Sequence, residues 1–180
     1  VMADCPTYFL SAERAGADEI ARSAAQLETA PNVRMMLETM PGLAVILDMH
    51  RQIVAGNARF ADAMGATAST GIHGTAAAPT AGESALGADM LGRRMGEALG
   101  CVNATVMPGG CGTSQACRHC GAAIAQSHAL EARASTQECR ITARSGQATV
   151  NYDFRVSATP VTIDATPYIV FNAVDISDEK

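Results

Sequence analysis

Four cysteines lie close together in one short segment of this chain. Residues 100–121 read GCVNATVMPGGCGTSQACRHCG and contain four of the six cysteines among 180 residues. Thiolates this close in sequence can ligate a metal, form disulfides or alternate between the two states. Cys117 and Cys120 are separated by two residues, so both thiolates can hold one metal atom from a single turn. The segment therefore predicts a metal-ligand set of Cys101, Cys111, Cys117 and Cys120.

Two kinds of metal centre fit four thiolates, a tetrahedral zinc ion and an iron–sulfur cluster. Structural zinc sites usually contain two short cysteine pairs, whereas this segment has one. The wider spacing of Cys101 and Cys111 favours a cluster of the 2Fe–2S or 4Fe–4S type, because its irons are spread apart. Glycines beside the thiols let backbone N–H groups point at sulfur. Zinc, and a thiol–disulfide pair without metal, are the alternatives.

Other cysteines and histidines are weaker candidates. His119 could replace a thiolate as ligand, but an outward or hydrogen-bonding role is favoured for it. Cys139 alternates with polar neighbours, so we expect it to pack in the core, close enough to support the centre or to act as an alternative ligand. Cys5 is expected to be an inert thiol near a loose end, and His73 a solvated side chain in a loop.

Composition narrows the class of protein. The net charge of −5 comes without a basic patch, which argues against nucleic acid as a partner. No run of 18 apolar residues indicates a membrane span, and residues 1–19 lack the pattern of a secretion signal. We therefore expect a soluble cytoplasmic protein without a membrane partner, in which thiols stay reduced.

Hydrophobic periodicity predicts the elements that position these thiols. Residues 7–40 are predicted to be helical, with apolar stripes that end at Pro41-Gly42. Strands are expected at 43–48 and 51–55, joined by a turn at Met49-His50. A short helix should follow, with Asn57 as N-cap and Gly65 as its end.

The second half of the chain is predicted to be mostly strands. Residues 66–88 are expected to form a mobile loop, and residues 90–100 are helix-like. Strict alternation in QECRITARSG and TVNYDFRVSATPV, followed by PYIVFNAVDIS, predicts three more strands. The expected fold class is α+β, with a five-stranded antiparallel sheet, helices on one face and an N-terminal helical extension.

Residues 32–178 resemble the PAS sensor fold. The resemblance rests on Asp48, Ile53-Val54 and Asn57 near its start and on the triplet Asp175-Ile176-Ser177 at its end. It implies a PAS domain over 32–178, containing the loop 66–88 and the cysteine-rich segment 100–121. An N-terminal extension, 1–31, would supply a dimer contact, and 175–180 would be the signal exit to an output linker.

A narrower resemblance concerns function. The stretches AERAGADEI, LDMHRQIV, LGRRMGEALGC and GGCGTSQACRHCGAAIAQS are similar to a bacterial group of PAS-containing sensor histidine kinases of two-component systems. The resemblance implies a homodimeric, non-enzymatic sensor fragment whose kinase core lies elsewhere. Together with the cysteines, it predicts oxygen or redox sensing through an iron–sulfur cluster. The alternative is a zinc-stabilised interaction or dimerisation module that senses nothing.

Overall fold

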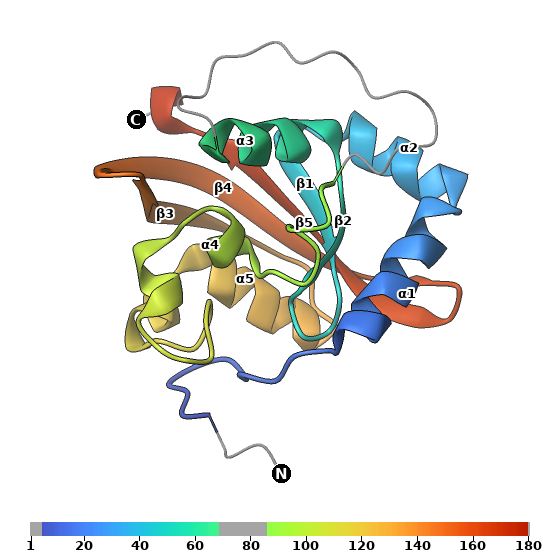
Figure 1. Ribbon diagram of the computed structural model, residues 1–180, viewed down its shortest axis with the longest axis horizontal. Helices are drawn as coiled ribbons and strands as arrows, with labels where there is room; N and C mark the ends of the chain where they lie inside the picture. The colour runs from blue at the N-terminus through green and yellow to red at the C-terminus, as the bar shows by residue number, and fades with distance from the viewer. Residues whose placement is uncertain (1–4, 69–85, 180) are drawn as a thin grey trace.

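A single antiparallel sheet organises the molecule (Figure 1). The computed structural model describes residues 5–68 and 86–179. The strand order is β2-β1-β5-β4-β3, which confirms the predicted five-stranded α+β class. The strands are β1 (Leu43–Leu47), β2 (Ile53–Gly56), β3 (Ser135–Ser145), β4 (Ala148–Ile163) and β5 (Thr166–Asp175).

Most helices lie between β2 and β3 in the chain. Three of them, α3, α4 and α5, follow β2, whereas α1 and α2 precede the sheet. No helix in the described part of the chain is long and apolar enough to cross a membrane. The α-helices are α1 (Ala17–Glu28), α2 (Pro31–Thr39), α3 (Ala58–Ala68), α4 (Met95–Ala98) and α5 (Gly121–Leu130), and the 3-10 turns are η1 (Val102–Thr105), η2 (Gln115–His119) and η3 (Ser177–Glu179).

Different helices cover the two faces of the sheet. Helices α3, α4 and α5 pack on one face, and α1 and α2 pack on the other. Because strand side chains alternate between faces, β5 contributes Ile169 and Phe171 to the first core and Tyr168 to the second. The apolar stripe of α1, Ile20 and Leu27, is buried against the sheet of its own chain. The dimer contact predicted for these helices stays a prediction.

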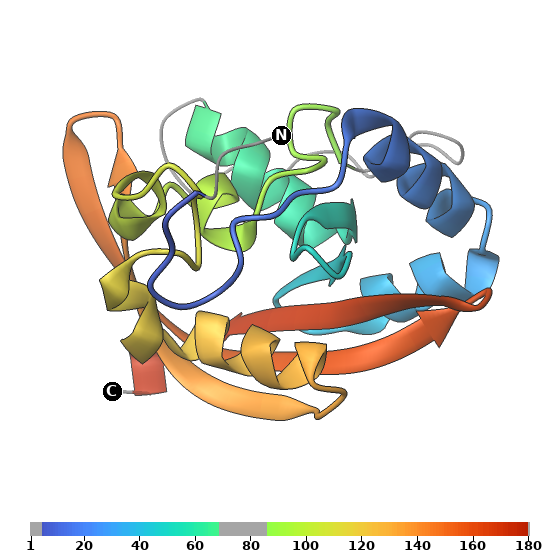
Figure 2. The ribbon, with the colours of Figure 1, turned by 90° about the horizontal axis from the view of Figure 1, so that it is seen from below.

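The segment before α1 is extended rather than helical, so the prediction of helix from residue 7 was wrong. Its backbone pairs with another part of the chain: the N–H of Tyr8 donates to the carbonyl of Thr113, and that of Leu10 to Gly112. Figure 2 shows this segment running across the loops of residues 100–120 before it enters α1. The N-terminal segment therefore covers the cysteine-rich part of the molecule.

The turn between β1 and β2 is longer than predicted. Asp48 Oδ1 accepts hydrogen bonds from the N–H groups of His50 (2.9 Å) and Gln52 (2.7 Å). Arg51 has a φ of 66°, outside the β region, so the second strand begins at Ile53 and not at residue 51. This turn directs the Arg51 side chain into the protein, where it is buried.

Two helix boundaries also differ from prediction. Helix α3 continues past Gly65 to Ala68, because one glycine inside a helix weakens it without ending it. The helix predicted over residues 90–100 is confined to α4, because Gly92 and Arg93 pair with the backbone of Ile53 at the sheet edge. Of the loop predicted at 66–88, residues 69–85 lie outside the described residues.

Asn57 is the predicted N-cap of α3, and the structure confirms it. Its Oδ1 accepts hydrogen bonds from the N–H groups of Phe60 (2.9 Å) and Ala44 (3.2 Å). Its amide also donates to the carbonyl of Gly42 at 3.1 Å. One fully buried side chain thus joins the start of α3 to β1 and to the turn before it.

We expect Asn57→Ala to lower the free energy of unfolding by about 2–4 kcal/mol, because a helix cap and buried hydrogen bonds are lost together. Urea denaturation followed by circular dichroism measures the change. Asn151→Ala is the matched control: Asn151 is exposed on β4 and accepts a bond from Thr142. Its loss should change stability by less than about 0.5 kcal/mol. Equal effects of the two substitutions would contradict the capping role.

Candidate functional site

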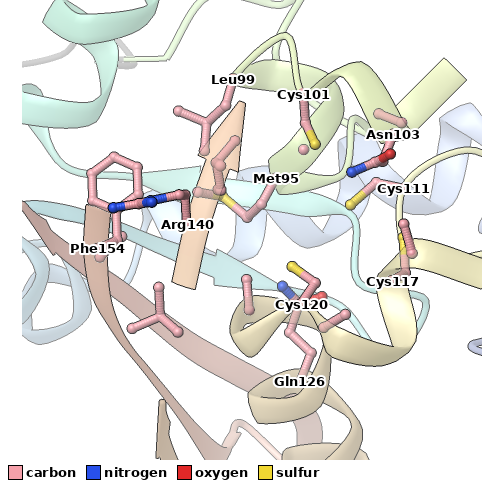
Figure 3. Close-up of a pocket in the computed structure, with 18 of the residues that line it drawn as sticks. Met95, Leu99, Cys101, Asn103, Cys111, Cys117, Cys120, Gln126, Arg140 and Phe154 are labelled. Carbon is pink, nitrogen blue, oxygen red and sulfur yellow. The ribbon is translucent and has the colours of Figure 1, made fainter. Parts of the chain in front are cut away.

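The four predicted cysteines line one cavity between the short helices and the sheet (Figure 3). They come from separate positions: Cys101 follows α4, Cys111 lies between η1 and η2, Cys117 is in η2, and Cys120 directly precedes α5. In Figure 3, Cys101, Cys111 and Cys117 lie along one side of the cavity, and Cys120 lies on another.

The cavity has a volume of about 120 Å³. This is close to the roughly 150 Å³ of a protein cavity that holds one benzene molecule, so there is room for one compact group. Apolar side chains form much of the remaining wall and limit the access of water; they include Met95, Leu99, Phe154, Val156 and Phe171.

A fifth thiol lies beside the four. Cys139 is 3% exposed on β3, and its Sγ is 3.5 Å from Cys120 Sγ. The predicted inward orientation of Cys139 is thus confirmed. The approach depends on Gly121, where a Cβ atom would lie 2.0 Å from the carbonyl oxygen of Glu138. Only glycine lets the start of α5 lie this close to β3.

Gly96 likewise allows close packing, on the other side of the cavity. A Cβ atom at this position would lie 2.7 Å from Cys111 Sγ and 3.3 Å from Cys101 Cβ. The missing side chain therefore makes space for two thiols against α4. The N–H of Gly96 also faces the Cys111 sulfur and favours its thiolate.

Backbone N–H groups stabilise charge on several of the sulfurs. Those of Asn103 and Ala104 act on Cys101, and those of Ala122 and Ala123 act on Cys120. The latter two belong to the first turn of α5, where free N–H groups and the helix dipole favour an anion. Cys117 has a side-chain partner, since Ser114 Oγ lies 3.2 Å from its Sγ. The site thus offers donors to sulfur, but they belong to other residues than the glycines that flank the four thiols.

The thiols differ in acidity. The hydrogen bond from Cys139, together with the N–H groups of α5, lowers the pKa of Cys120 to about 6, although burial opposes the shift. The same hydrogen bond and burial raise the pKa of Cys139. Burial raises the pKa of Cys111 to about 12 and also raises the pKa of Cys101. Cys120 is therefore the more acidic thiol of the contacting pair.

Two buried guanidinium groups hold the loop that carries Cys111. Arg51 Nη1 donates to the carbonyl of Cys111 at 3.0 Å, and Arg94 Nη1 donates to the same oxygen at 3.3 Å. Arg94 also donates to the carbonyls of Gly109 (2.8 Å) and Glu13 (2.6 Å). Arg51 donates to the carbonyl of Ser11. These contacts join the N-terminal segment, the β1–β2 turn and the cysteine loop.

The charge around this loop is mainly positive. Glu97 accepts hydrogen bonds from the N–H groups of Arg94 (3.0 Å) and Cys111 (3.1 Å), and it forms an ion pair with Arg14. Burial, together with the neighbouring charge of Arg51, lowers the pKa of Arg94 to about 10. Three guanidinium groups thus face one carboxylate, which leaves positive charge beside Cys111 for an anionic group to balance.

Sequence reasoning missed this charged cluster. Arg94 and Glu97 lie inside the stretch LGRRMGEALGC, but nothing in its pattern distinguishes them from solvent-exposed residues. One sequence feature could have indicated the cluster: Arg94 and Glu97 lie in the last turns of chain before Cys101.

Not every candidate residue enters the cavity as a donor. His119 is exposed at the cavity rim, as the predicted outward role requires. Cys5 is a free thiol that does not line the cavity.

Within residues 5–68 and 86–179, no three Cys, His, Asp or Glu side chains lie close enough together to hold one metal ion. The predicted His73 lies outside the described residues.

The triplet Asp175-Ile176-Ser177, predicted as the signal exit, forms a turn at the end of β5. Asp175 Oδ1 accepts hydrogen bonds from the N–H of Ser177 (2.8 Å) and from its hydroxyl (2.6 Å), forming a tight turn after β5. Ile176 is buried, and its N–H donates to the carbonyl of Asp153 at 2.8 Å. The triplet is therefore fixed to β4 and marks the point at which the chain leaves the sheet.

Two solved structures resemble this chain at low similarity. The PAS domain of an HTR-like protein from Haloarcula marismortui is 15% identical; the match covers 86% of this chain and 98% of that chain, with a TM-score of 0.45. An RNA-binding light-oxygen-voltage receptor is 18% identical over 84% of this chain and 34% of its own length, with a TM-score of 0.49. No protein-family model and no curated protein matches the sequence.

The topology itself defines the class of fold. The chain is an α+β domain with the sheet order β2-β1-β5-β4-β3. In the part of the chain that the structure describes, α3, α4 and α5 lie between β2 and β3. This is the PAS fold expected from the sequence, with two N-terminal helices added on the second face of the sheet.

We expect Gly96→Ala to destabilise the reduced, metal-free protein by about 1–3 kcal/mol, because the added methyl group overlaps Cys111 Sγ. Urea denaturation measures the change. Gly65→Ala is the matched control, since a Cβ at this position in α3 meets nothing within 4 Å. It should stabilise the protein by up to about 1 kcal/mol. A neutral Gly96→Ala would show that the thiols are not packed against α4.

The acidity of Cys120 gives a separate prediction for the metal-free protein. Its alkylation by iodoacetamide should increase with pH around a midpoint near 6, because the thiolate forms above the lowered pKa. In Cys139→Ala, where the hydrogen-bond donor is lost, the midpoint should rise toward the ordinary value of about 8.5. Mass spectrometry of the alkylated peptide measures both. Cys5→Ala should leave the midpoint unchanged, and a midpoint near 8.5 in the parent protein would contradict the assignment.

Proposed function

We propose that this chain is the cytoplasmic sensor domain of a signal-transduction protein, in which an iron–sulfur cluster responds to oxygen or redox state. Cys101, Cys111, Cys117 and Cys120 would hold the cluster. One observation carries the proposal: four thiols from separate segments line the same cavity, which has the volume of one compact group.

The types of residue around the cavity suit such a group. Binding would require the thiols to move closer together, since no three of the described Cys, His, Asp or Glu side chains lie close enough to hold one metal ion. A cluster takes one thiolate per ligand position from points spread around it, as these four cysteines are spread. The positive charge of Arg51 and Arg94 beside Cys111 would balance the negative charge of the thiolates. N–H groups of Gly96, Ala122 and Ala123 stabilise that charge further.

When bound, an iron–sulfur cluster supplies reversible electron transfer, with a potential set by hydrogen bonds to sulfur and by solvent exposure. The chain's own residues control both. Backbone N–H groups donate to the sulfurs, and the apolar wall formed by Met95, Leu99 and Phe154 keeps water away. The N-terminal segment covers the loop from outside through the carbonyls of Ser11 and Glu13.

The sheet offers a route from this site to an output. Phe171 and Ala173 of β5 line the cavity, and β5 ends two residues later at Asp175. A change in packing at the cavity wall would therefore act on the strand that leads directly to Asp175-Ile176-Ser177. We propose that the exit continues to a histidine kinase core and that the domain acts as a homodimer.

A zinc-stabilised interaction module is the second candidate. The Cys117-x-x-Cys120 pair, with both residues at the cavity, is the observation in its favour. Zinc would fasten α5 to the cysteine loop without providing electron transfer. Metal content and colour separate the two proposals.

We expect the protein purified without oxygen to be brown, with broad charge-transfer absorption in the visible range and with iron and sulfide bound in equal amounts. Replacing Cys101, Cys111, Cys117 or Cys120 with Ser should remove most of the iron, because the serine hydroxyl is seldom deprotonated. Cys5→Ser is the matched control and should keep it. A colourless protein with one zinc per chain would overturn the cluster in favour of the structural module.

Cys101 has its own comparison, because ten positions separate it from Cys111, the next ligand in the chain. Cys101→Ser and His119→Ala are measured side by side as iron bound per chain. Loss in the first and retention in the second support the four-cysteine set. The reverse result would place the His119 imidazole in the site and refute that set.

A further inference from the structure

Two thiols of the site are in direct contact. Cys120 Sγ and Cys139 Sγ are 3.5 Å apart. A disulfide bond is about 2.05 Å long, so the sulfurs need to approach by only about 1.5 Å, which side-chain rotation can supply. Cys139 lies outside the proposed four-thiol ligand set, so its contact with Cys120 is available for chemistry between the two sulfurs.

The backbone around the pair is fixed at short range. Gly121 follows Cys120 and lies against the carbonyl of Glu138, which precedes Cys139. The N–H of Ala122 acts on both sulfurs, which places them at the same point of the first turn of α5. The two side chains therefore meet at a position where helix and strand cannot easily separate.

We propose that Cys120 and Cys139 form a disulfide when the cavity holds no cofactor, with a peroxide as the oxidant. The accessibility of the two sulfurs determines which of them reacts first with peroxide. Cys120 is half-buried and lines the cavity, whereas Cys139 is 3% exposed and lies behind it. A small peroxide that enters the cavity meets the Cys120 sulfur first.

The reaction balances in two steps. The Cys120 thiol attacks one oxygen of hydrogen peroxide; an S–O bond forms and the O–O bond breaks. The departing hydroxide takes the thiol proton, so that Cys120 sulfenic acid and one water result. Cys139 then attacks the Cys120 sulfur; an S–S bond forms, the S–O bond breaks, and a second water leaves with the Cys139 proton. Two thiols are oxidised by two electrons, and one peroxide is reduced to two waters.

The regulatory role of this disulfide rests on the proposed function, because it concerns a ligand of the proposed cluster. The Cys120 sulfur cannot ligate the proposed cluster while it is bonded to Cys139. Oxidation of the empty site would therefore block reloading until a thiol reductant opens the bond, and it would fasten α5 to β3. The domain would therefore stay in an oxidised, cofactor-free state until the disulfide is reduced.

The test uses the full chain, stripped of metal with a chelator, reduced, and treated with one equivalent of hydrogen peroxide. Tryptic cleavage after Arg118, Arg133 and Arg140 puts Cys120 and Cys139 alone on peptides 119–133 and 134–140. We expect a linked pair of these peptides that is lost on reduction, and a fall from six free thiols to four. Protein reconstituted with iron and sulfide should form the link at least about tenfold more slowly, because Cys120 is coordinated.

Matched variants complete the test. Cys139→Ala and Cys139→Ser should give no linked peptide and should leave a sulfenic acid on Cys120 that dimedone traps. Cys5→Ala should form the link as the parent does. Six remaining thiols, over-oxidation of Cys120 in the parent, or a link from Cys120 to peptide 95–118 would overturn the proposal. An iron-free protein as isolated would refute the cluster instead, and the peroxide result is obtained in either case.

Discussion

Arg51 and Arg94 carry two like charges that are buried against the same carbonyl oxygen, that of Cys111. Burying a guanidinium group costs several kcal/mol unless its N–H groups find partners, and here carbonyls of distant segments supply them. The N-terminal segment, the β1–β2 turn and the cysteine loop are each held by these two side chains. The cysteine loop thus has a fixed shape, because its carbonyl groups accept the hydrogen bonds of the two buried arginines.

The same constraint links folding to the contents of the cavity. Glu97 balances one positive charge and also fixes the N–H of Cys111, but Arg14, Arg51 and Arg94 bring three. Thiolates that bind a metal would supply the missing negative charge at the place where it is needed. Because the unfolded chain holds no preformed site, a metal bound here would add its binding free energy to the free energy of folding.

The sequence predicted the parts of this structure that depend on local pattern. Alternation placed Cys139 on the inner face of β3, and the cap at Asn57 was recognised from its neighbours. The cluster of Arg51 and Arg94 could not be predicted, because an arginine is read as exposed unless its partners are known. Those partners are backbone carbonyls far away in the chain, and no side-chain pattern marks them. The pairing of residues 92 and 93 with Ile53 escaped prediction for the same reason.

The position of the thiols relative to the sheet places the cavity between two differently held parts of the domain. On one side of the cavity, Cys111 belongs to a loop held by buried charge, so its movement requires rearrangement of the N-terminal segment as well. On the other side, Cys120 begins a helix that lies directly on β3, with Gly121 touching the strand backbone. A group bound in the cavity would therefore link the Cys111 loop directly to the start of α5. Under the proposed function, loss of that group would remove this link while the Cys120–Cys139 contact remains, and Phe171 and Ala173 of β5, which line the cavity, would pass the change toward Asp175.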